Sequence, residues 1–282
     1  MQTLIVGADG QLGRELIEVF SVEGPTTGMT FAELDILDAS ALQYAADRVS
    51  PDIVVNAAAY TDVERAESDR KAAFAVNETG ARNVAELARE RDIPTVYFST
   101  DFVFDGSKRE PYEADDLVSP NGVYAESKAA GEAATRDTWD KHFIIRTAWL
   151  YGIGGNNFVE KILKAAETRP SLRVVDDEVG SPTYTRDLSE ATRALARTAA
   201  YGTYHGVNGG QCSRFEFAQE ILRLAGLTNA VEPCRASEFP SKAPRPAYSV
   251  LSNARLEAAC GFTMPHWKDA LQRFMQKRET IQ

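Results

Sequence analysis

The sequence predicts an α/β fold in which a doubly wound parallel sheet is followed by a smaller, mixed α/β lobe. Through the first half of the 282 residues, short apolar strands alternate with helical patterns, as in parallel sheets that carry helices on both faces. A glycine-rich turn joins the first strand directly to the first helix, and the regular alternation is lost beyond residue 150. We therefore expect a first domain over residues 1–150 and a second lobe over residues 151–282, interleaved with the first around a shared cleft.

The hydrophobic pattern divides the first domain into strands and helices. A helix is expected directly after the glycine turn because Leu12, Leu16 and Val19 fall on one face. Asp38 is a good N-cap for a second helix that ends at Val49. The expected strands cover residues 3–6, 25–29, 52–60, 93–100 and 142–150, and the expected helices cover residues 11–20, 39–49, 70–91 and 124–139.

The second lobe is expected to be smaller and mixed. Helices are predicted over residues 157–168 and 186–197, with a strand and a turn between them. Ser213 and Glu216 have the spacing of a capping box at the start of a further helix, and Gly226 supplies its stop. No low-complexity linker separates the two halves, so they are expected to pack closely.

Composition excludes several classes of function. The chain is 44% hydrophobic and 26% charged, which is typical of a soluble globular protein. A formal net charge of -10 argues against binding nucleic acid through its phosphates. No apolar segment approaches the length of a membrane span or a signal peptide, so no membrane contact and a cytoplasmic location are expected. Cys212, Cys234 and Cys260 are far apart and show no metal or redox spacing, so they are read as free thiols.

The turn "GADGQLG" predicts a dinucleotide site. Gly7, Gly10 and Gly13 follow the first strand at three-residue intervals and open a helix. Backbone amides at a helix start bind a pyrophosphate well, and missing side chains let it approach. A Rossmann-like domain is therefore expected, with the cofactor held by Gly7, Gly10, Gln11, Leu12 and Gly13.

The choice between NADPH and NADH stays open at this stage. An acid at the end of the second strand would favour NADH, whereas an arginine there would favour the 2'-phosphate of NADPH. The segment "PTTGMTFAE" provides neither at that position. Asp35 and Ile36 are candidates for contact with the adenine, and the alternative is that Asp35 is only a turn or cap residue.

Polar residues at a later strand end precede a tyrosine and a lysine four positions apart. Ser99, Thr100 and Asp101 close the strand "IPTVYFST" at the sheet edge where ligands bind in this architecture. Tyr124 and Lys128 lie in "VYAESKAAG", one helical turn apart. Such a pair either shares a helix face without function or transfers a proton. Its position after the glycine turn and Thr100 favours proton transfer.

Taken in order, these motifs have the pattern of a known family. The glycine turn, "NAAAYTDVERAES", Asn77 in "AVNETGARNVA", "STDFVFDG" and the Tyr124–Lys128 pair resemble extended short-chain dehydrogenase/reductases that act on nucleotide sugars. Within that superfamily, "RTAWLYG", "NNFV" and "DDEVGSPTYTRDL" are similar to dTDP-4-dehydrorhamnose reductase. The resemblance covers almost the whole chain, about residues 3–274.

The resemblance implies a Thr-Tyr-Lys catalytic set, carried here by Thr100, Tyr124 and Lys128. The implied reaction is reduction of the 4-keto group of dTDP-4-dehydro-L-rhamnose by NADPH or NADH, which supplies an activated sugar for polysaccharide. A free tyrosine titrates near pH 10, so a nearby ammonium is expected to lower the pKa of Tyr124. Tyr124 would protonate the sugar oxygen, Thr100 would hold the same oxygen, and Lys128 would bond the nicotinamide ribose.

Further site residues follow from the resemblance alone. Ala59, Tyr60 and Thr61 are implied to line the cofactor, although tight packing also explains small residues there. Asn77 is implied to order the catalytic lysine, directly or through water. Near the substrate the resemblance implies Asp101 and Trp149 at the sugar, and Asn157 and Arg245 at the nucleotide; a core tryptophan and an exposed arginine without function are the alternatives.

Rival interpretations remain. A 4,6-dehydratase is disfavoured because Asp101 is followed by Phe102 where those enzymes usually carry Glu. A reductase or an epimerase of another nucleotide-linked keto sugar would share the Tyr-Lys pair, and a non-catalytic regulatory subunit of the methionine adenosyltransferase type resembles the same family. Some members form homodimers around a divalent metal, so a homodimer is an open expectation. No ligand spacing here assigns a metal site, and none is predicted.

Overall fold

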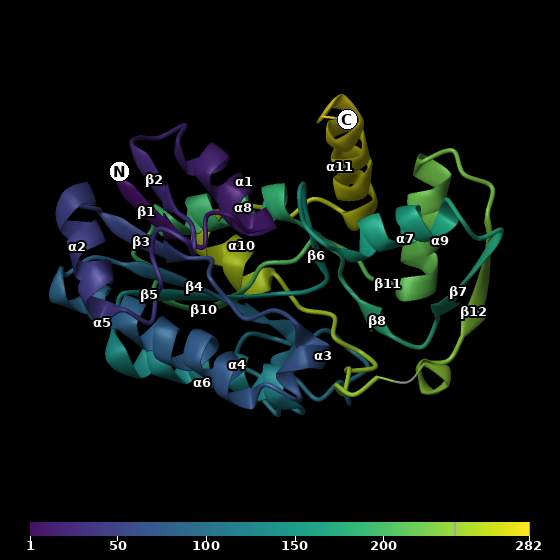
Figure 1. Cartoon of the computed structure of the whole chain (residues 1–282), viewed down its shortest axis with the longest axis horizontal. Coiled ribbons are helices and arrows are strands. Elements are labelled where there is room, and N and C mark those ends of the chain that lie inside the picture. The colour runs from purple at the N-terminus through teal and green to yellow at the C-terminus, as the bar shows by residue number, and fades with distance from the viewer. Residues whose placement is uncertain (240, 282) are drawn as a thin grey trace.

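The computed structural model describes residues 1–239 and 241–281 and has a parallel six-stranded sheet at its centre. The strand order is β10-β5-β4-β3-β1-β2, and every pairing in this sheet is parallel (Figure 1). This arrangement confirms the expected doubly wound α/β class. The strands are β1 (Thr3–Val6), β2 (Thr26–Met29), β3 (Ile53–Asn56), β4 (Thr95–Thr100), β5 (His142–Thr147) and β10 (Gly202–His205).

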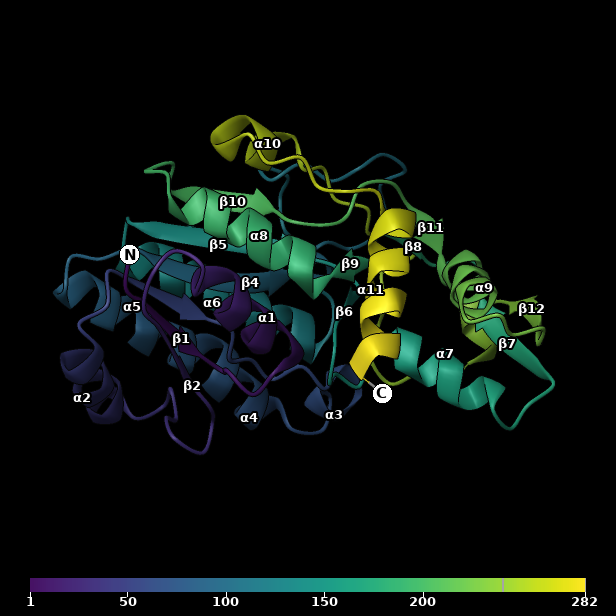
Figure 2. The ribbon, with the colours of Figure 1, turned by 90° about the horizontal axis from the view of Figure 1, so that it is seen from above.

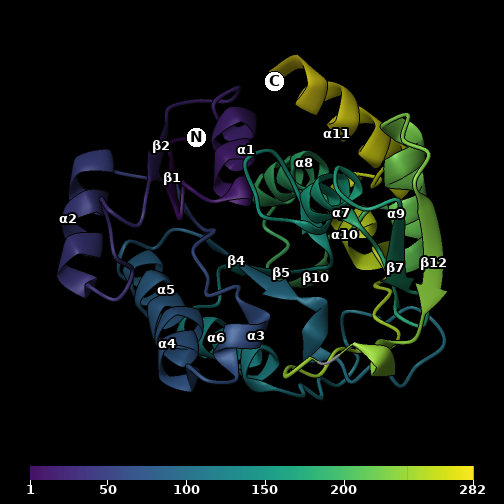
Figure 3. The same ribbon diagram turned by 45° about the vertical axis from the view of Figure 1, so that its right-hand side comes forward.

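Helices cover both faces of the sheet because each central strand is apolar on both sides (Figures 2 and 3). Ile5 and Val55 point into a core formed with α1 (Gln11–Phe20), α8 (Thr185–Ala196) and α10 (Ala254–Cys260). Their neighbours Leu4 and Val54 point into a second core on the other face. Helices α2 (Ala39–Val49), α5 (Ala81–Glu90) and α6 (Val123–Thr138) lie on that face.

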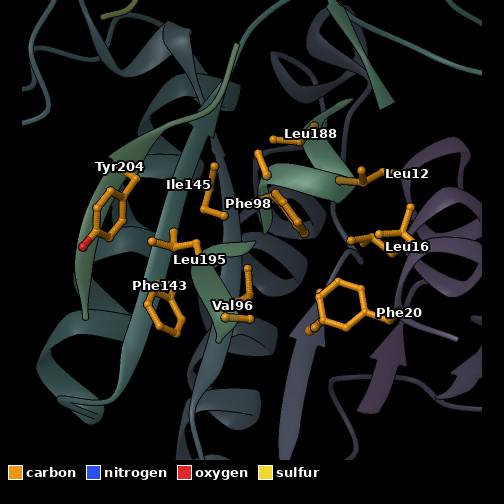
Figure 4. Close-up of a cluster of buried hydrophobic side chains, with 14 of the residues drawn as sticks. Leu12, Leu16, Phe20, Val96, Phe98, Phe143, Ile145, Leu188, Leu195 and Tyr204 are labelled. Atoms are coloured by element: carbon orange, nitrogen blue, oxygen red, sulfur yellow. The ribbon is translucent and has the colours of Figure 1, made fainter. Parts of the chain in front are cut away.

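The first core anchors the glycine turn. Leu12 and Leu16 of α1 are buried in the same cluster as Phe98 of β4 and Leu188 of α8 (Figure 4). The predicted apolar face of this helix is therefore correct, and its packing fixes where the helix begins. That start lies directly beside the carboxyl ends of the strands.

The second lobe is built from short paired strands and helices to one side of the sheet (Figure 1). Its strand pairs are parallel for β6 with β9 and β7 with β12, and antiparallel for β8 with β11. The capping box of Ser213 and Glu216 is present as predicted. The elements are β6 (Leu150–Tyr151), α7 (Phe158–Ala166), β7 (Ser171–Val175), β8 (Val179–Gly180), β9 (Thr183–Tyr184), β11 (Cys212–Ser213), α9 (Arg214–Leu224), β12 (Ala230–Cys234), η3 (Ala236–Glu238) and α11 (Trp267–Ile281).

The C-terminal half returns to the sheet, so the halves interleave. Strand β10 pairs with β5, and α8 packs on α1. Helix α11 lies between the sheet and the rest of the second lobe in Figure 2. From it, Lys277 bonds Glu15 of α1 at 2.9 Å and Arg278 bonds Glu160 of α7 at 2.8 Å. These ion pairs tie the helix to both sides.

The segment from residue 70 to residue 91 differs from the single regular helix that was expected. It consists of α4 (Arg70–Phe74), a π-helical segment η1 (Ala75–Gly80) and α5, with the short α3 (Val63–Ala66) before it. A π turn adds a residue to the helical turn, which sequence periodicity does not reveal, and it often marks a functional position. Here it contains Asn77.

Two predicted strands are also shorter than expected. The strand expected over 52–60 ends at Asn56, after which the chain turns across the sheet edge. The strand expected over 142–150 ends at Thr147, because Trp149 has a left-handed backbone with φ of 47°. Within the described residues, no helix is long and apolar enough to cross a membrane.

Small residues in α6 allow it to pack closely on η1 and β4. A Cβ atom at Gly131 would lie 2.1 Å from the main-chain oxygen of Asn77 and 2.2 Å from the Tyr97 hydroxyl. Only glycine permits this approach. The small-residue run around Tyr124 and Lys128 is therefore a packing surface that fixes both side chains relative to the sheet.

Candidate active site

A cavity of about 480 Å³ lies at the carboxyl ends of the central strands. Strand order reverses there between β1 and β3, which is where ligands bind in doubly wound sheets. The cavity brings together twelve of the predicted site residues: Gly10, Gln11, Leu12, Ala59, Thr61, Thr100, Asp101, Tyr124, Lys128, Trp149, Asn157 and Arg245. Six others lie outside its lining: Gly7, Gly13, Asp35, Ile36, Tyr60 and Asn77.

The glycine turn forms the floor on the cofactor side. Gly7 has φ of 77°, and a Cβ there would lie 2.5 Å from the Ala58 nitrogen; at Gly13 it would lie 2.2 Å from the Gly7 oxygen. Gly10 lines the cavity and is the N-cap of α1, which has no side-chain cap; a Cβ there would meet only the Gly7 oxygen, at 3.4 Å, an ordinary contact. The helix start is thus a bare cradle that fits a diphosphate. Gly7 and Gly13 shape the turn, and Gly10 leaves the approach open.

Thr100 and Asp101 close β4 and begin the short 3-10 turn η2 (Asp101–Val103). The Thr100 hydroxyl donates to Asp101 Oδ1 at 3.0 Å and accepts from the Phe102 N–H at 3.2 Å. Burial raises the pKa of Asp101 to about 6, against hydrogen bonds from Ser249 and Thr100 and the charge of Arg214. Asp101 is therefore a buried carboxyl with Oδ2 unbonded among the described residues.

Tyr124 lies in the first turn of α6 beside Thr100. Burial raises the pKa of Tyr124 to about 12; a hydrogen bond with Thr100 lowers it and the Asp101 charge raises it. The expected lowering of the Tyr124 pKa by Lys128 is therefore wrong, because burial dominates. Phe102 packs edge-on against the Tyr124 ring at 5.6 Å. At neutral pH Tyr124 is a phenol, the form that can give up a proton.

Lys128 lies one turn further along α6 and is almost fully buried. Its Nζ donates to the Phe98 oxygen at 2.6 Å and lies 4.2 Å from the centre of the Tyr97 ring. Burial lowers the pKa of Lys128 to about 7, while the Glu132 carboxylate raises it. This lysine can gain or lose a proton near neutrality.

Asn77 holds the cofactor-side loop against α6. Its Oδ1 accepts from the Tyr60 N–H at 2.9 Å, and its Nδ2 donates to the Tyr60 oxygen at 3.1 Å and to Ser127 Oγ at 2.9 Å. Ser127 in turn donates to the main-chain oxygen of Tyr124 at 2.8 Å. Asn77 is thus connected to the Tyr124 helix through Ser127, a fully buried neighbour of Lys128 that the sequence reading missed.

Asp35 and Ile36 lie beyond the cavity, after β2. The Asp35 carboxylate accepts the Leu37 N–H at 2.9 Å, so it closes a local turn. Ile36 is buried, and its side chain fills the space where a Cβ of Gly80 would lie. The contacts of Asp35 are therefore those of a turn residue, which was the alternative interpretation. Adenine binding by Asp35 and Ile36 stays a prediction.

Asn157 lines the cavity, and its side chain is engaged within the protein. Oδ1 caps α7 through the Glu160 N–H at 3.2 Å, while Nδ2 donates to the oxygen of Gly152 at 2.9 Å and to Gln11 Oε1 at 3.2 Å. Asn157 therefore joins the second lobe to the start of α1. Its contact with the nucleotide stays a prediction.

A larger hollow of about 870 Å³ adjoins the cavity and is lined mainly by the second lobe. Arg245, Lys161 and Arg214 line both spaces. Arg245 donates to Glu64 of α3 at 3.2 Å, and Glu64 also accepts from Ser241 and Lys242. Hydrogen bonds from Ser241 and Lys242 lower the pKa of Glu64 to about 2. Glu64 thus joins α3 to the loop that carries Ser241, Lys242 and Arg245.

Arg214 is the main site residue that the sequence reading missed. Its guanidinium carbon lies 3.5 Å from the centre of the Trp149 ring, inside the lining shared by the two spaces. The sequence shows that Arg214 follows the N-cap Ser213 at the start of a helix. It does not show the contact with Trp149, which lies 65 residues away and depends on how the lobes pack. Within the described residues, no group of three or more His, Cys, Asp or Glu side chains is arranged to hold a metal.

Comparison with known proteins places the chain among reductases of this architecture. The model of the RmlD substrate binding domain matches residues 1–280. The chain is 41% identical to the spore coat polysaccharide biosynthesis protein SpsK of Bacillus subtilis (strain 168), covering 99% of this chain and 98% of that protein. It is 40% identical to a dTDP-4-dehydrorhamnose reductase of Streptomyces griseus, covering 95% of this chain and 91% of that one.

Solved structures agree with this comparison. The crystal structure of dTDP-4-dehydrorhamnose reductase from Bacillus anthracis str. Ames, determined in complex with NADP, superposes with a TM-score of 0.95 at 39% identity and covers 98% of both chains. The similarity extends over the sheet and the second lobe together. The chain therefore belongs to the dTDP-4-dehydrorhamnose reductase family.

Proposed function

We propose that this protein reduces the 4-keto group of dTDP-4-dehydro-L-rhamnose to give dTDP-L-rhamnose, with NADPH or NADH as reductant. The observation that carries the proposal is that Thr100, Tyr124 and Lys128 line one cavity with the glycine turn and Trp149. The cavity continues at a rim of three cations into a hollow large enough for a nucleotide. Membership of the family supports the same reaction.

The cofactor site is proposed along the cradle at the start of α1. Gly10 and the free amides of that helix start would hold the diphosphate, and Ala59 and Thr61 line the path toward Thr100. When bound there, NAD(P)H supplies the hydride that reduces the carbonyl carbon. Lys128 would bond its ribose hydroxyls, and Asp35 with Ile36 would lie at its adenine end.

Tyr124 is proposed as the proton donor to the sugar oxygen. Its raised pKa of about 12 keeps the phenol protonated until charge develops on that oxygen. Thr100, which donates to Asp101 and lines the same cavity as Tyr124, would hold the same oxygen and stabilise its charge. The three residues divide proton transfer, charge stabilisation and cofactor orientation among them.

The substrate would lie across both hollows. Asp101 and Trp149 are proposed to contact the sugar, because they line the cavity beside Tyr124. Lys161 and Arg245 would meet the diphosphate at the shared rim, since a guanidinium suits such an anion. Asn157 would keep the junction between the lobes in place.

Two rival functions are less well supported. A dehydratase needs a second acid or base after Thr100, and the structure has Asp101 followed by Phe102, whose ring packs against Tyr124. A non-catalytic binding subunit would not require Thr100, Tyr124 and Lys128 around one cavity. An epimerase would use the same three groups, and the product of the reaction distinguishes an epimerase from a reductase.

The test is to supply dTDP-4-dehydro-L-rhamnose, made in the same tube, with NADPH or NADH and to identify the product by mass and NMR. We expect one equivalent of reduced cofactor to be consumed per dTDP-L-rhamnose formed. If reduced cofactor is consumed only with dTDP-4-keto-6-deoxy-D-glucose, the substrate is that other 4-keto sugar nucleotide. If a sugar carbon is inverted without consumption of cofactor, the protein is an epimerase. A cytoplasmic location and a homodimer belong to the same proposal, and cell fractionation and sedimentation of the purified protein test them.

A further inference from the structure

Trp149 has a backbone conformation that a bulky residue rarely adopts. Its φ is 47°, one of three positive values at non-glycine positions in the described residues. The residue ends the run of β5 and leads into β6, and its main-chain oxygen accepts the Thr183 N–H at 3.3 Å. Strain of this kind persists only where surrounding groups hold the residue in place.

Two groups from the second lobe contact the Trp149 ring. The guanidinium of Arg214 lies 3.5 Å from the ring centre, the closest of the cation–ring distances in the described residues. Gly180 of β8 approaches so closely that a Cβ there would lie 2.6 Å from Trp149 Cε2. The indole is therefore set by these two contacts and by its own backbone.

Arg214 is itself held firmly. It is the first residue of α9 and lies inside the capping box formed by Ser213 and Glu216. Its main-chain N–H donates to the Glu178 oxygen at 3.3 Å, and its Nε lies 3.6 Å from the Glu178 carboxylate. Cys212 of β11 pairs with Gly180 of β8, and Arg214 follows β11 directly as the first residue of α9. The two groups that touch the indole are therefore joined through one small sheet.

We propose that Arg214 is a positioning residue for the reductase reaction, which fixes the Trp149 indole as the wall of the sugar site. The inference rests on the proposed function, because it assigns Trp149 to the sugar side of the cavity. A fixed indole keeps the carbonyl close to Tyr124, and a small displacement of a reacting group lowers rates steeply. Arg214 thereby acts through Trp149 rather than on the diphosphate.

The first test is a cycle of Arg214→Lys, Trp149→Leu and the double variant. Lysine keeps the positive charge and loses the flat guanidinium that stacks on the ring. We expect Arg214→Lys to lower kcat/KM for the sugar nucleotide by about tenfold or more. In the Trp149→Leu background the same change should have less than about a twofold effect, because its target is gone. Losses that simply multiply would overturn the proposal.

A binding measurement separates positioning from phosphate recognition. The affinity for dTDP alone, which lacks the sugar, should change by less than about threefold in Arg214→Lys. A loss of dTDP affinity equal to the loss in kcat/KM would show that Arg214 acts on the nucleotide and would contradict the proposal. Gly180→Ala should reproduce the fall in kcat/KM, because the added methyl group displaces the same ring while leaving the guanidinium in place.

A spectroscopic readout is independent of any substrate. The near-ultraviolet circular dichroism of Trp149 is the difference between each protein and its Trp149→Phe counterpart. This difference should shrink in the Arg214→Lys background, and an unchanged band would overturn the proposal even if the substrate were another sugar. Arg223→Lys is the matched control, since Arg223 lies on the same helix and is 65% exposed beside Glu220; it should leave rate and spectrum unchanged.

Discussion

Lys128 Nζ donates a 2.6 Å hydrogen bond to the main-chain oxygen of Phe98, two residues before Thr100. The bond ties the helix that carries Tyr124 to the strand that carries Thr100. It places all three catalytic candidates in one rigid unit of α6 and β4. Burial in this unit is also what lowers the pKa of Lys128 to about 7.

Cofactor affinity should fall as pH rises through neutrality. Above pH 7 the free protein holds Lys128 increasingly as the neutral amine, whereas an anionic cofactor favours the ammonium, so binding takes up a proton. The Kd for NADPH should rise by up to about tenfold per pH unit above 7, until the pKa of the bound lysine is passed. Fluorescence titration from pH 6 to 9 measures this. The Lys128→Met variant should bind NADPH weakly, with a Kd nearly independent of pH. Lys71→Met, at an exposed position, should show the same dependence of Kd on pH as the native protein. A native Kd that does not change with pH would contradict the assignment of proton uptake to Lys128.

Gly131→Ala should destabilise the protein, although alanine normally stabilises a helix interior by about 1 kcal/mol over glycine. The new methyl group would lie 2.1 Å from the Asn77 oxygen, so α6 must move away from η1. We expect a loss of about 2 kcal/mol or more in the free energy of unfolding, together with reduced turnover as Asn77 and Tyr124 shift. Thermal melts and kcat measure both. Ala133→Gly on the same helix is the control for propensity alone and should cost about 1 kcal/mol; a more stable Gly131→Ala would disprove the packing argument.

Glu132 and Arg146 form a buried ion pair beneath the active site. Arg146 donates to both carboxylate oxygens, at 2.8 and 2.7 Å, and both side chains are less than a tenth exposed. Glu132→Ala should cost about 3–5 kcal/mol because it leaves the guanidinium buried and unpaired. Urea denaturation measures the loss. As a control, Arg70→Ala removes the 2.7 Å ion pair between Arg70 and Glu126, whose side chains are 59% and 40% exposed, and should cost under about 1 kcal/mol. Equal losses of stability in Glu132→Ala and Arg70→Ala would contradict the role of burial.

Local sequence patterns predicted the parts of the site that local structure positions. The glycine turn, Thr100 and the Tyr124–Lys128 pair each stand at a strand end or helix start, where the order of elements fixes their place. The predicted N-caps at Asp38 and Ser213 are present for the same reason. The motif pattern also identified the family correctly.

Features that depend on long-range packing were not predictable. Arg214 meets Trp149 only because the β8–β11 pair folds against the end of β5. The π turn at Asn77 leaves no mark in the residue types of its helix. Strand β10 lies beyond residue 200 in the sequence, and its pairing with β5 depends on the packing of the whole chain. The sign of the pKa shift at Tyr124 was also missed, since the balance between burial and a neighbouring charge is set by the tertiary structure.

In the proposed mechanism Tyr124 gives the proton to the sugar oxygen, while Lys128 and the glycine turn hold the cofactor. The most direct measurement is the single-turnover rate of reduced-cofactor oxidation by Tyr124→Phe, with the Kd for NADPH determined on the same samples. We expect the rate to fall by about 10²–10⁴-fold with the Kd nearly unchanged, because only the transferable proton is removed. A rate within about threefold of that of the native protein, at equal cofactor affinity, would show that Tyr124 is not the proton donor.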